Sequence, residues 1–286
     1  MLHPIDILQA TSNVLSRAEP CVLATLVGVE GSSPRPAGSQ MLIRADGSFE
    51  GMLSSGCVEQ AIVGQALDAL ADGRARTLRY GKDSPWFDLQ LPCGSGIDVQ
   101  LCVNPDSTLV RDTLETLQKR KTVRWLLDQH GQWQRAQRPA TEGHTQTFFP
   151  RWQLVAAGRG PMLVSLAAIA KSCDIEVHIF SPDKTDLEAA QPFVHASQQL
   201  SHADQFNCPP LDKHSAAVTL FHDHDWEPPV LKAMLATNTA YIAALGSPRA
   251  HSERLMELAH EWQISTTDEE REAAWTEMLS IHADQL

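Results

Sequence analysis

The sequence predicts an α/β protein in which a mixed α+β domain is followed by a doubly wound parallel-sheet domain. From residue 151 onward, strand-length apolar runs alternate with amphipathic helices, which is typical of a parallel sheet covered on both faces. Before that point, apolar runs are joined by short turns such as Asp46-Gly47, which is typical of hairpins. The 286 residues suffice for two ordinary domains. We therefore expect domains at 1–105 and 151–286, joined by a connector helix and hairpin at 106–150.

Composition narrows the class of protein. Hydrophobic residues make up 43% of the chain and charged residues 20%, which is enough apolar side chain for well-packed cores. The 35 Asp and Glu residues outnumber the 23 Lys and Arg residues. The resulting formal net charge of −12 argues against nucleic-acid binding, which requires a basic surface.

Targeting signals and cysteine motifs are not evident. The first twenty residues lack the basic start and apolar core of a secretory signal, and no apolar run approaches the length that crosses a bilayer. The scattered cysteines form no CxxC pair, so neither structural zinc nor a dithiol redox motif is indicated. We expect a cytoplasmic protein with reduced thiols and no membrane partner. The cysteines are Cys21, Cys57, Cys93, Cys102, Cys173 and Cys208.

Elements of the first half follow from the period of the apolar residues. A period of 3.6 residues predicts helices, and continuous or alternating apolar runs predict strands. In the last of these strands apolar and polar residues alternate, so we expect one buried and one exposed face. The predicted helices are 5–18 and 57–73, and the predicted strands are 21–29, 41–44, 48–53 and 97–103.

The connector and the second half follow by the same rules. The connector is predicted to contain a helix at 107–120 and a hairpin that turns at His130-Gly131. A polar stretch rich in breakers, 138–151, is the expected domain boundary. In the second half the predicted strands are 153–158, 175–181, 216–221 and 240–246, and the predicted helices are 161–173, 230–236 and 252–262.

A cysteine at a predicted helix start is the first candidate for chemistry. In GMLSSGCVEQ, residues 51–60, Gly56 can serve as the N-cap, which places Cys57 in the first turn and Glu59 at the third position. An acid there complements the helix dipole and can accept hydrogen bonds from free amides, and the same dipole stabilises a thiolate. Cys57 is therefore a candidate soft ligand or nucleophile. A small packing residue is the alternative.

A second turn has the chemistry of an anion site. In GSSPRPAG, residues 31–38, the hydroxyls of Ser32 and Ser33 lie close in sequence to the guanidinium of Arg35. Hydroxyls, backbone amides and a planar guanidinium are the groups that bind phosphate. The alternative is a surface turn with a solvated arginine.

A third turn, LPCGSG at 91–96, places Cys93 and Gly94 just before a predicted strand. Glycine at such a position lets a ligand approach the backbone closely. Together, the three turns predict a site for a phosphorylated, sulfur-bearing ligand.

The order and spacing of these turns resemble the N-terminal domain of the XdhC/CoxI family, the maturation factors of molybdenum hydroxylases. The resemblance lies in EGSSPRPAGSQM, DGSFEGMLSSGCVEQAIV and LPCGSGIDVQL, over about the first hundred residues. The second half is similar to the family's Rossmann-type domain in the order of its strands and helices, and in FHDHDWEPPVLKAML and YIAALGSPRAHSERL.

The resemblance implies a carrier of molybdenum cofactor that is not itself an enzyme. Such a protein protects the sulfurated cofactor, works with a cysteine desulfurase, and inserts the cofactor into the large subunit of an apo-hydroxylase such as xanthine dehydrogenase or aldehyde oxidoreductase. The cofactor has a phosphate tail and a dithiolene-bound metal, so anion-binding and thiol groups suit it. The expected site is Ser32, Ser33, Arg35, Gly56, Cys57, Glu59, Cys93 and Gly94, with Cys57, and Cys93 as a further option, facing the molybdenum or its sulfur.

The second domain is expected to dock partners or to hold a cytosine dinucleotide extension of the cofactor. Its candidate contacts are Gly158, Ser247 and Arg249, and a homodimer is a further option. His222 and His224 follow a predicted strand and could ligate a metal, although a polar loop that caps the next helix is the alternative.

Departures from the family pattern leave other functions open. Ser55-Gly56 replaces a glycine pair, and Ser95 replaces the last glycine of a CGG motif, so each adds a side chain near the ligand. Only Gly158 of the G-x-G-x-x-G fingerprint is present, and Pro161 removes an amide, which disfavours the alternative of an NAD(P)-dependent oxidoreductase. A scaffold that bridges the desulfurase and the hydroxylase is the other alternative. Residues 264–286 lack the glycine and proline of the family's C-terminal segment and are predicted to form a charged helix.

Overall fold

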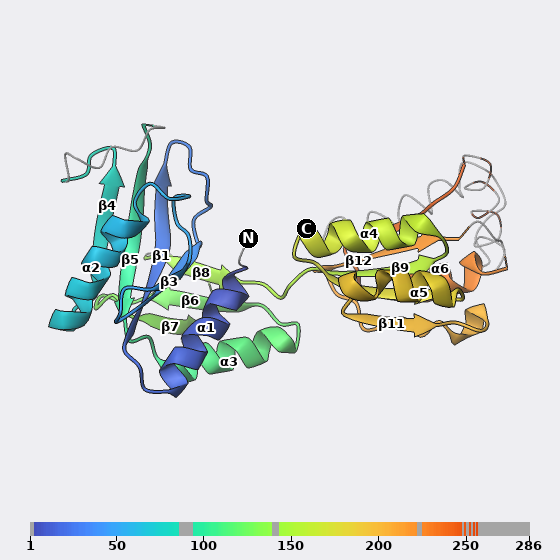
Figure 1. Cartoon of the computed structure of the whole chain (residues 1–286), viewed down its shortest axis with the longest axis horizontal. Helices are drawn as coiled ribbons and strands as arrows, with labels where there is room; N and C mark the ends of the chain where they lie inside the picture. Colours follow the sequence, from blue (N-terminus) through green and yellow to red (C-terminus); the bar gives the residue numbers. More distant parts are fainter. Residues whose placement is uncertain are drawn as a thin grey trace. The chain divides into compact units, whose positions relative to one another are not determined.

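The chain consists of two compact units, residues 1–150 and 151–286 (Figure 1). The computed structural model describes residues 3–85, 94–138, 143–221 and 225–247, and beyond them Arg249, Ser252, Arg254 and Met256. The predicted cysteine at 93, the histidines at 222 and 224, and the predicted C-terminal helix lie outside the described residues.

A five-stranded antiparallel sheet forms the centre of the first unit, in the order β3-β2-β1-β5-β4. A second, three-stranded sheet has the order β7-β6-β8. The elements are α1 (Pro4–Ser16), β1 (Cys21–Glu30), β2 (Gln40–Arg44), β3 (Phe49–Gly51), α2 (Glu59–Asp72), β4 (Arg76–Gly81), β5 (Gly96–Val103), α3 (Ser107–Gln118), β6 (Val123–Leu127), β7 (Trp133–Ala136) and β8 (Thr145–Phe148).

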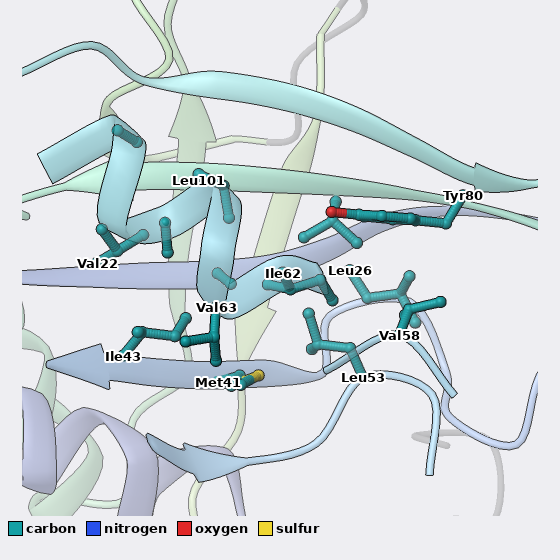
Figure 2. Packing of buried hydrophobic residues seen from close by; sticks show 14 of the residues in the cluster. Val22, Leu26, Met41, Ile43, Leu53, Val58, Ile62, Val63, Tyr80 and Leu101 are labelled. Atoms are coloured by element: carbon teal, nitrogen blue, oxygen red, sulfur yellow. The ribbon is translucent and has the colours of Figure 1, made fainter. Parts of the chain in front are cut away.

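Both faces of the five-stranded sheet are covered. Helix α2 packs on one face, where Val63 lies beside Met41 and Ile43 of β2 (Figure 2). The other face packs against α1, α3 and the three-stranded sheet, with Trp125 of β6 fully buried among them. Because both faces are covered, β5 is buried along nearly its whole length, and the expectation of one exposed face was wrong.

The region expected to be a connector contributes to this core. Helix α3 contacts α1, and the three-stranded sheet supplies Trp125 and its neighbours to the same apolar cluster. The hairpin at His130-Gly131 is confirmed by the pairing of β6 with β7. Strand β8 was not predicted, because its sequence lies in a stretch of breakers. It pairs with β6.

The second unit contains the doubly wound sheet that was predicted. Its five strands are parallel and have the order β11-β10-β9-β12-β13. Helices α4 and α5 belong to the apolar cluster on one face, and α6 to the cluster on the other. The elements are β9 (Gln153–Gly158), α4 (Pro161–Ser172), β10 (Glu176–Ser181), α5 (Lys184–Ala190), β11 (Ala196–Gln199), β12 (Ser215–Leu220), α6 (Glu227–Leu235) and β13 (Tyr241–Ala244), with short 3₁₀ turns at Gln191–Phe193 and Ala203–Gln205.

Among the described residues, each helix is too short or too polar to span a membrane.

Replacement of Gly51 by alanine is expected to lower the free energy of unfolding of the first unit by about 2–4 kcal/mol. Gly51 has a φ of +92°, and an added Cβ would lie 2.4 Å from the carbonyl oxygen of Gln40. In the control variant Gly64→Ala, no atom lies within 4 Å of the new Cβ, and a gain of up to about 1 kcal/mol is expected in the helix. Urea denaturation followed by circular dichroism measures both. Equal free energies of unfolding for Gly51→Ala and Gly64→Ala would contradict the close contact between Gly51 and Gln40.

Candidate functional site

The three glycine-rich turns leave the same end of the five-stranded sheet. The end of β1 at Glu30 pairs with the start of β5 at Gly96, and the end of β3 at Gly51 pairs with the start of β2. In an antiparallel sheet these strand ends point the same way, so turns 31–39, 52–58 and 94–95 emerge at this end, the site edge of the sheet. The end is staggered, because β2 starts opposite Thr25 whereas β1 and β5 extend to the Glu30–Gly96 pair. Turns 31–39 and 94–95 also touch, because a Cβ on Gly31 would lie 3.3 Å from the Cβ of Ser95.

A buried carboxylate organises turn 52–58. The side chain of Glu59 accepts hydrogen bonds from the backbone N–H groups of Leu53 at 3.0 Å, Ser54 at 2.7 Å and Gly56 at 2.8 Å. It accepts another from the Ser54 hydroxyl at 2.7 Å. The Ser54 oxygen in turn accepts from the amide of Cys57 at 3.1 Å. Few conformations of the turn satisfy all these bonds, so Glu59 and Ser54 fix the backbone on both sides of Cys57.

The ionised form of Glu59 is favoured in this environment. Glu59 is 3% exposed, and burial by itself raises the pKa of a carboxyl. The hydrogen bonds from the Ser54 hydroxyl and from the backbone amides of Ser54 and Leu53 act in the opposite direction and prevail, so the pKa of Glu59 lies below its ordinary value.

Cys57 lies outside the helix, which corrects the sequence prediction. Helix α2 begins at Glu59, with Val58 as its N-cap, so Cys57 precedes the first helical residue by two positions. The amides of Gly56, Cys57 and Val58 all donate to Glu59 or Ser54, so they are not free to stabilise a thiolate as expected. The Cys57 side chain is exposed. The alternative of a buried packing residue is therefore wrong.

The two residues that precede Cys57 adopt left-handed backbone angles. Ser55 has a φ of 68° and Gly56 a φ of 107°. A Cβ on Gly56 would meet no atom within 4 Å, so glycine is favoured there by its backbone angle and not by lack of space. Ser55 adopts its angle with an exposed side chain.

Turn 31–39 contains a cation with an unsatisfied donor. Arg35 is half-buried, and its Nε is shielded from solvent with no hydrogen-bond acceptor in reach among the residues that the structure describes. Its backbone N–H donates to the hydroxyl of Ser33 at 3.3 Å, and Ser32 is exposed. A buried guanidinium N–H without an acceptor is costly, so this group is suited to an anion that supplies one.

Strand β8 supports the same turn. The side-chain amide of Gln146 donates to the carbonyl oxygen of Gly38 at 3.3 Å. Gly38 itself donates to the carbonyl oxygen of Leu26 at 2.7 Å. The unpredicted strand thus holds the far end of the turn that contains Arg35.

Other cations at this edge are already neutralised. Arg79 of β4 donates to Asp98 at 2.9 Å and also pairs with Glu30, which binds Lys82 as well. These ion pairs link the ends of β1, β4 and β5, whereas the Nε of Arg35 has no acceptor among the described residues.

The remaining predicted residues are Gly94, three residues of the second unit, and residues outside the described part of the chain. Gly94 is exposed at the edge, with a φ of 68° and open space around it. Gly158, Ser247 and Arg249 belong to the second unit. Gly158 ends β9, where a Cβ would lie 2.6 Å from the Cβ of Leu220, so close strand packing accounts for this glycine. Among the described residues there is no cluster of His, Cys, Asp or Glu that could hold a metal ion.

Sequence reasoning missed Ser54 and Gln146. Ser54 had a local signal, since a hydroxyl residue stands five positions before the acid that starts a helix. Gln146 had none, because its partner Gly38 lies 108 positions away.

A polar cavity of about 360 Å³ lies elsewhere in the first unit. Helix α1 and the β2–β3 hairpin line it, including the ion-paired Arg44 and Glu50. None of the predicted site residues lines this cavity.

Comparisons with known proteins cover both units. The profile of the XdhC and CoxI family matches residues 14–81, and the profile of the XdhC Rossmann domain matches residues 154–274. The molybdenum cofactor insertion chaperone PaoD of Escherichia coli K12 is 34% identical over 273 residues, which is 93% of this chain and 79% of PaoD.

Two further matches are more distant. A probable xanthine dehydrogenase subunit of Bacillus subtilis 168 is 27% identical, over 86% of this chain and 85% of that protein. A crystal structure described as a xanthine dehydrogenase of Bacillus halodurans has a TM-score of 0.72 at 20% identity, over 89% of this chain and 85% of the other. The second match shows that the fold is shared.

Replacement of Glu59 by glutamine is expected to lower the free energy of unfolding at pH 7 by about 1.5–3 kcal/mol, because a charged hydrogen-bond acceptor is lost. The pKa of Glu59 is lowered in the fold, so its contribution is present above the ordinary value of 4.5 and is lost as the pH falls through the folded pKa. The stability difference between wild type and Glu59→Gln should therefore shrink below about pH 4.5.

Urea denaturation between pH 3 and pH 8 measures this difference. Asp68→Asn removes an exposed carboxylate from the same helix and is the control, with an expected change within about 0.5 kcal/mol. A difference for Glu59→Gln that does not vary with pH would contradict the role of its charge.

Proposed function

The chain belongs to the XdhC and CoxI family, and from this premise we propose that it is a molybdenum cofactor chaperone that matures a molybdenum hydroxylase. The observation that carries the proposal is that an exposed thiol on a fixed turn and a half-buried guanidinium with an unsatisfied donor lie on turns that leave the same end of one sheet. The identity with PaoD supports a role in cofactor insertion and not in catalysis.

The proposed cargo matches the groups at this edge. Molybdenum cofactor has a phosphate at one end and a metal with sulfur ligands at the other. Arg35 supplies the unsatisfied N–H for the phosphate, with the hydroxyls of Ser32 and Ser33 beside it in sequence. Cys57 supplies a thiol for the molybdenum or its terminal sulfur. Cys93 and Gly94 complete the proposed site, the cysteine from outside the described residues.

Glu59 was predicted both to accept hydrogen bonds from amides at the helix start and to contact the cofactor. Its carboxylate is buried and accepts hydrogen bonds from the turn. We therefore assign it as a positioning residue that acts through Cys57, and not as a contact of the cofactor.

Partners follow from the same proposal. The client is the large subunit of an apo molybdenum hydroxylase, of the xanthine dehydrogenase or aldehyde oxidoreductase type, in the cytoplasm. A cysteine desulfurase supplies the terminal sulfur, and the chain protects the sulfurated cofactor until insertion. A cytosine dinucleotide form of the cargo and a homodimer are further parts of the proposal that gel filtration and cofactor analysis can address.

Replacement of Cys57 by alanine is expected to abolish retention of molybdenum cofactor. Wild type and variant are mixed with the cofactor without oxygen, and bound molybdenum is measured after gel filtration. Near-stoichiometric retention is expected in wild type and in the control Cys173→Ala, which removes an exposed thiol from the second unit. Retention in neither wild type nor variant, with undiminished maturation of the hydroxylase, would instead favour a scaffold between desulfurase and client.

Replacement of Arg35 by alanine is expected to weaken binding of the cofactor by about 10- to 100-fold, which corresponds to the loss of a charged hydrogen bond. Arg35→Lys should restore part of the affinity, because it keeps the charge and loses the planar donor pair. Arg74→Ala removes an exposed arginine of the same unit and is the control. Equal affinities for Arg35→Ala and Arg74→Ala, from equilibrium titration, would contradict the phosphate contact.

A further inference from the structure

The second unit has a fold that usually binds a dinucleotide, and its glycine turn can be tested for that use. In doubly wound sheets the pyrophosphate binds at the turn after the first strand, where the next helix presents free N–H groups. Here this turn joins β9 to α4. Strands β10 and β12 flank β9 on either side, so the turn lies at the point where the strand order reverses.

The N–H groups at the start of α4 are mostly used or missing. The N–H of Gly160 donates to the carboxylate of Asp186 at 2.6 Å. Pro161 has no N–H, and the N–H of Leu163 bonds back to the carbonyl oxygen of Gly160 at 3.1 Å. At most the amide of Met162 remains for a ligand in the first turn of α4. A phosphate needs several such donors at once.

The carboxylate of Asp186 also repels a phosphate. Asp186 lies in the first turn of α5, and α5 packs against α4. A negative side chain at the N-terminus of α4 is favourable because it complements the helix dipole. A phosphate would therefore have to displace an anion that is already well placed, and would meet its charge.

The position after β10 that binds the ribose in dinucleotide-binding folds is also occupied by bonds within the chain. Ser181 ends β10, where dinucleotide-binding folds place an acid, and its hydroxyl accepts the N–H of Asp183 at 3.1 Å. The carboxylate of Asp183 in turn accepts the N–H of Thr185 at 2.9 Å and caps α5. The nearest acid after β10 is thus engaged in a helix cap.

We infer that the phosphate position of the second unit is filled by the chain's own Asp186, and that Asp186 excludes phosphate-bearing ligands from this turn. The unit keeps the doubly wound fold without the dinucleotide. For the cargo of the proposed function, on which this last step rests, the phosphate and any nucleotide extension are then bound elsewhere than at the β9–α4 turn.

The test uses the full chain with inorganic pyrophosphate, ADP and NADH as probes, so it does not depend on molybdenum cofactor. Every sample carries Arg35→Ala, which removes the anion site proposed for the first unit, and the chain with Asp186 intact is the wild type of this series. Calorimetric titration of this wild type is expected to show no binding of any probe. Asp186→Ala is expected to bind pyrophosphate with an affinity at least 10-fold above wild type. Glu188→Ala removes an acid from the same helix that does not contact Gly160, and it should behave as wild type.

A second measurement follows the contact itself. The Gly160 amide resonance should move in Asp186→Ala, where its acceptor is lost, and should keep its wild-type position in Glu188→Ala. If the alanine variant loses stability, Asp186→Asn keeps an acceptor oxygen and removes the charge.

Two outcomes would overturn the inference. One is binding of NADH or pyrophosphate by wild type at least as tight as by Asp186→Ala. The other is failure of the folded Asp186 variants to bind pyrophosphate, which would mean that Asp186 is not the excluding group. Neither outcome bears on retention of molybdenum cofactor by the first unit, so the proposed function stands or fails separately.

Discussion

The carboxylate of Glu59 is the interaction on which the candidate site depends. It gathers the amides of a turn that has no regular structure of its own, and it does so from the first residue of a helix. Without this acceptor, the N–H groups of the buried residues Leu53 and Ser54 would lack partners. The backbone of Cys57 is held in place because its own amide and that of Val58 donate to Ser54 and that of Gly56 donates to Glu59.

In both units a carboxylate accepts backbone N–H groups just before a helix, with different consequences. At the start of α2, Glu59 consumes the amides and leaves a cysteine exposed beside them. At the start of α4, Asp186 consumes the amide of Gly160 and leaves a dinucleotide fold without its phosphate position. In each case a helix N-terminus, which attracts anions, is occupied by a carboxylate of the same chain.

Residues beyond 105 support the turn that contains Arg35 and cover one face of the first sheet. Turn 31–39 is held at one end by Gln146 of β8, and β8 belongs to the small sheet that packs beneath the larger one. The region between the predicted domains is therefore part of the scaffold of the site. A shorter unit that ended near residue 105 would lose this support and the cover over Leu23 and Cys102.

Local patterns in the sequence were enough to predict the two fold classes and the family. Each of these depends on local periods, turn residues and motif spacing, as in the Asp46-Gly47 hairpin and the strands of the second unit. Three features became visible only in the fold: α2 starts at Glu59, β8 forms in a stretch of breakers, and Asp186 accepts the N–H of Gly160. Strand β8 and the contact of Asp186 depend on residues that are far away in the sequence. The start of α2 depends on which side chain accepts the N–H groups of the turn, and a local sequence pattern does not specify that acceptor.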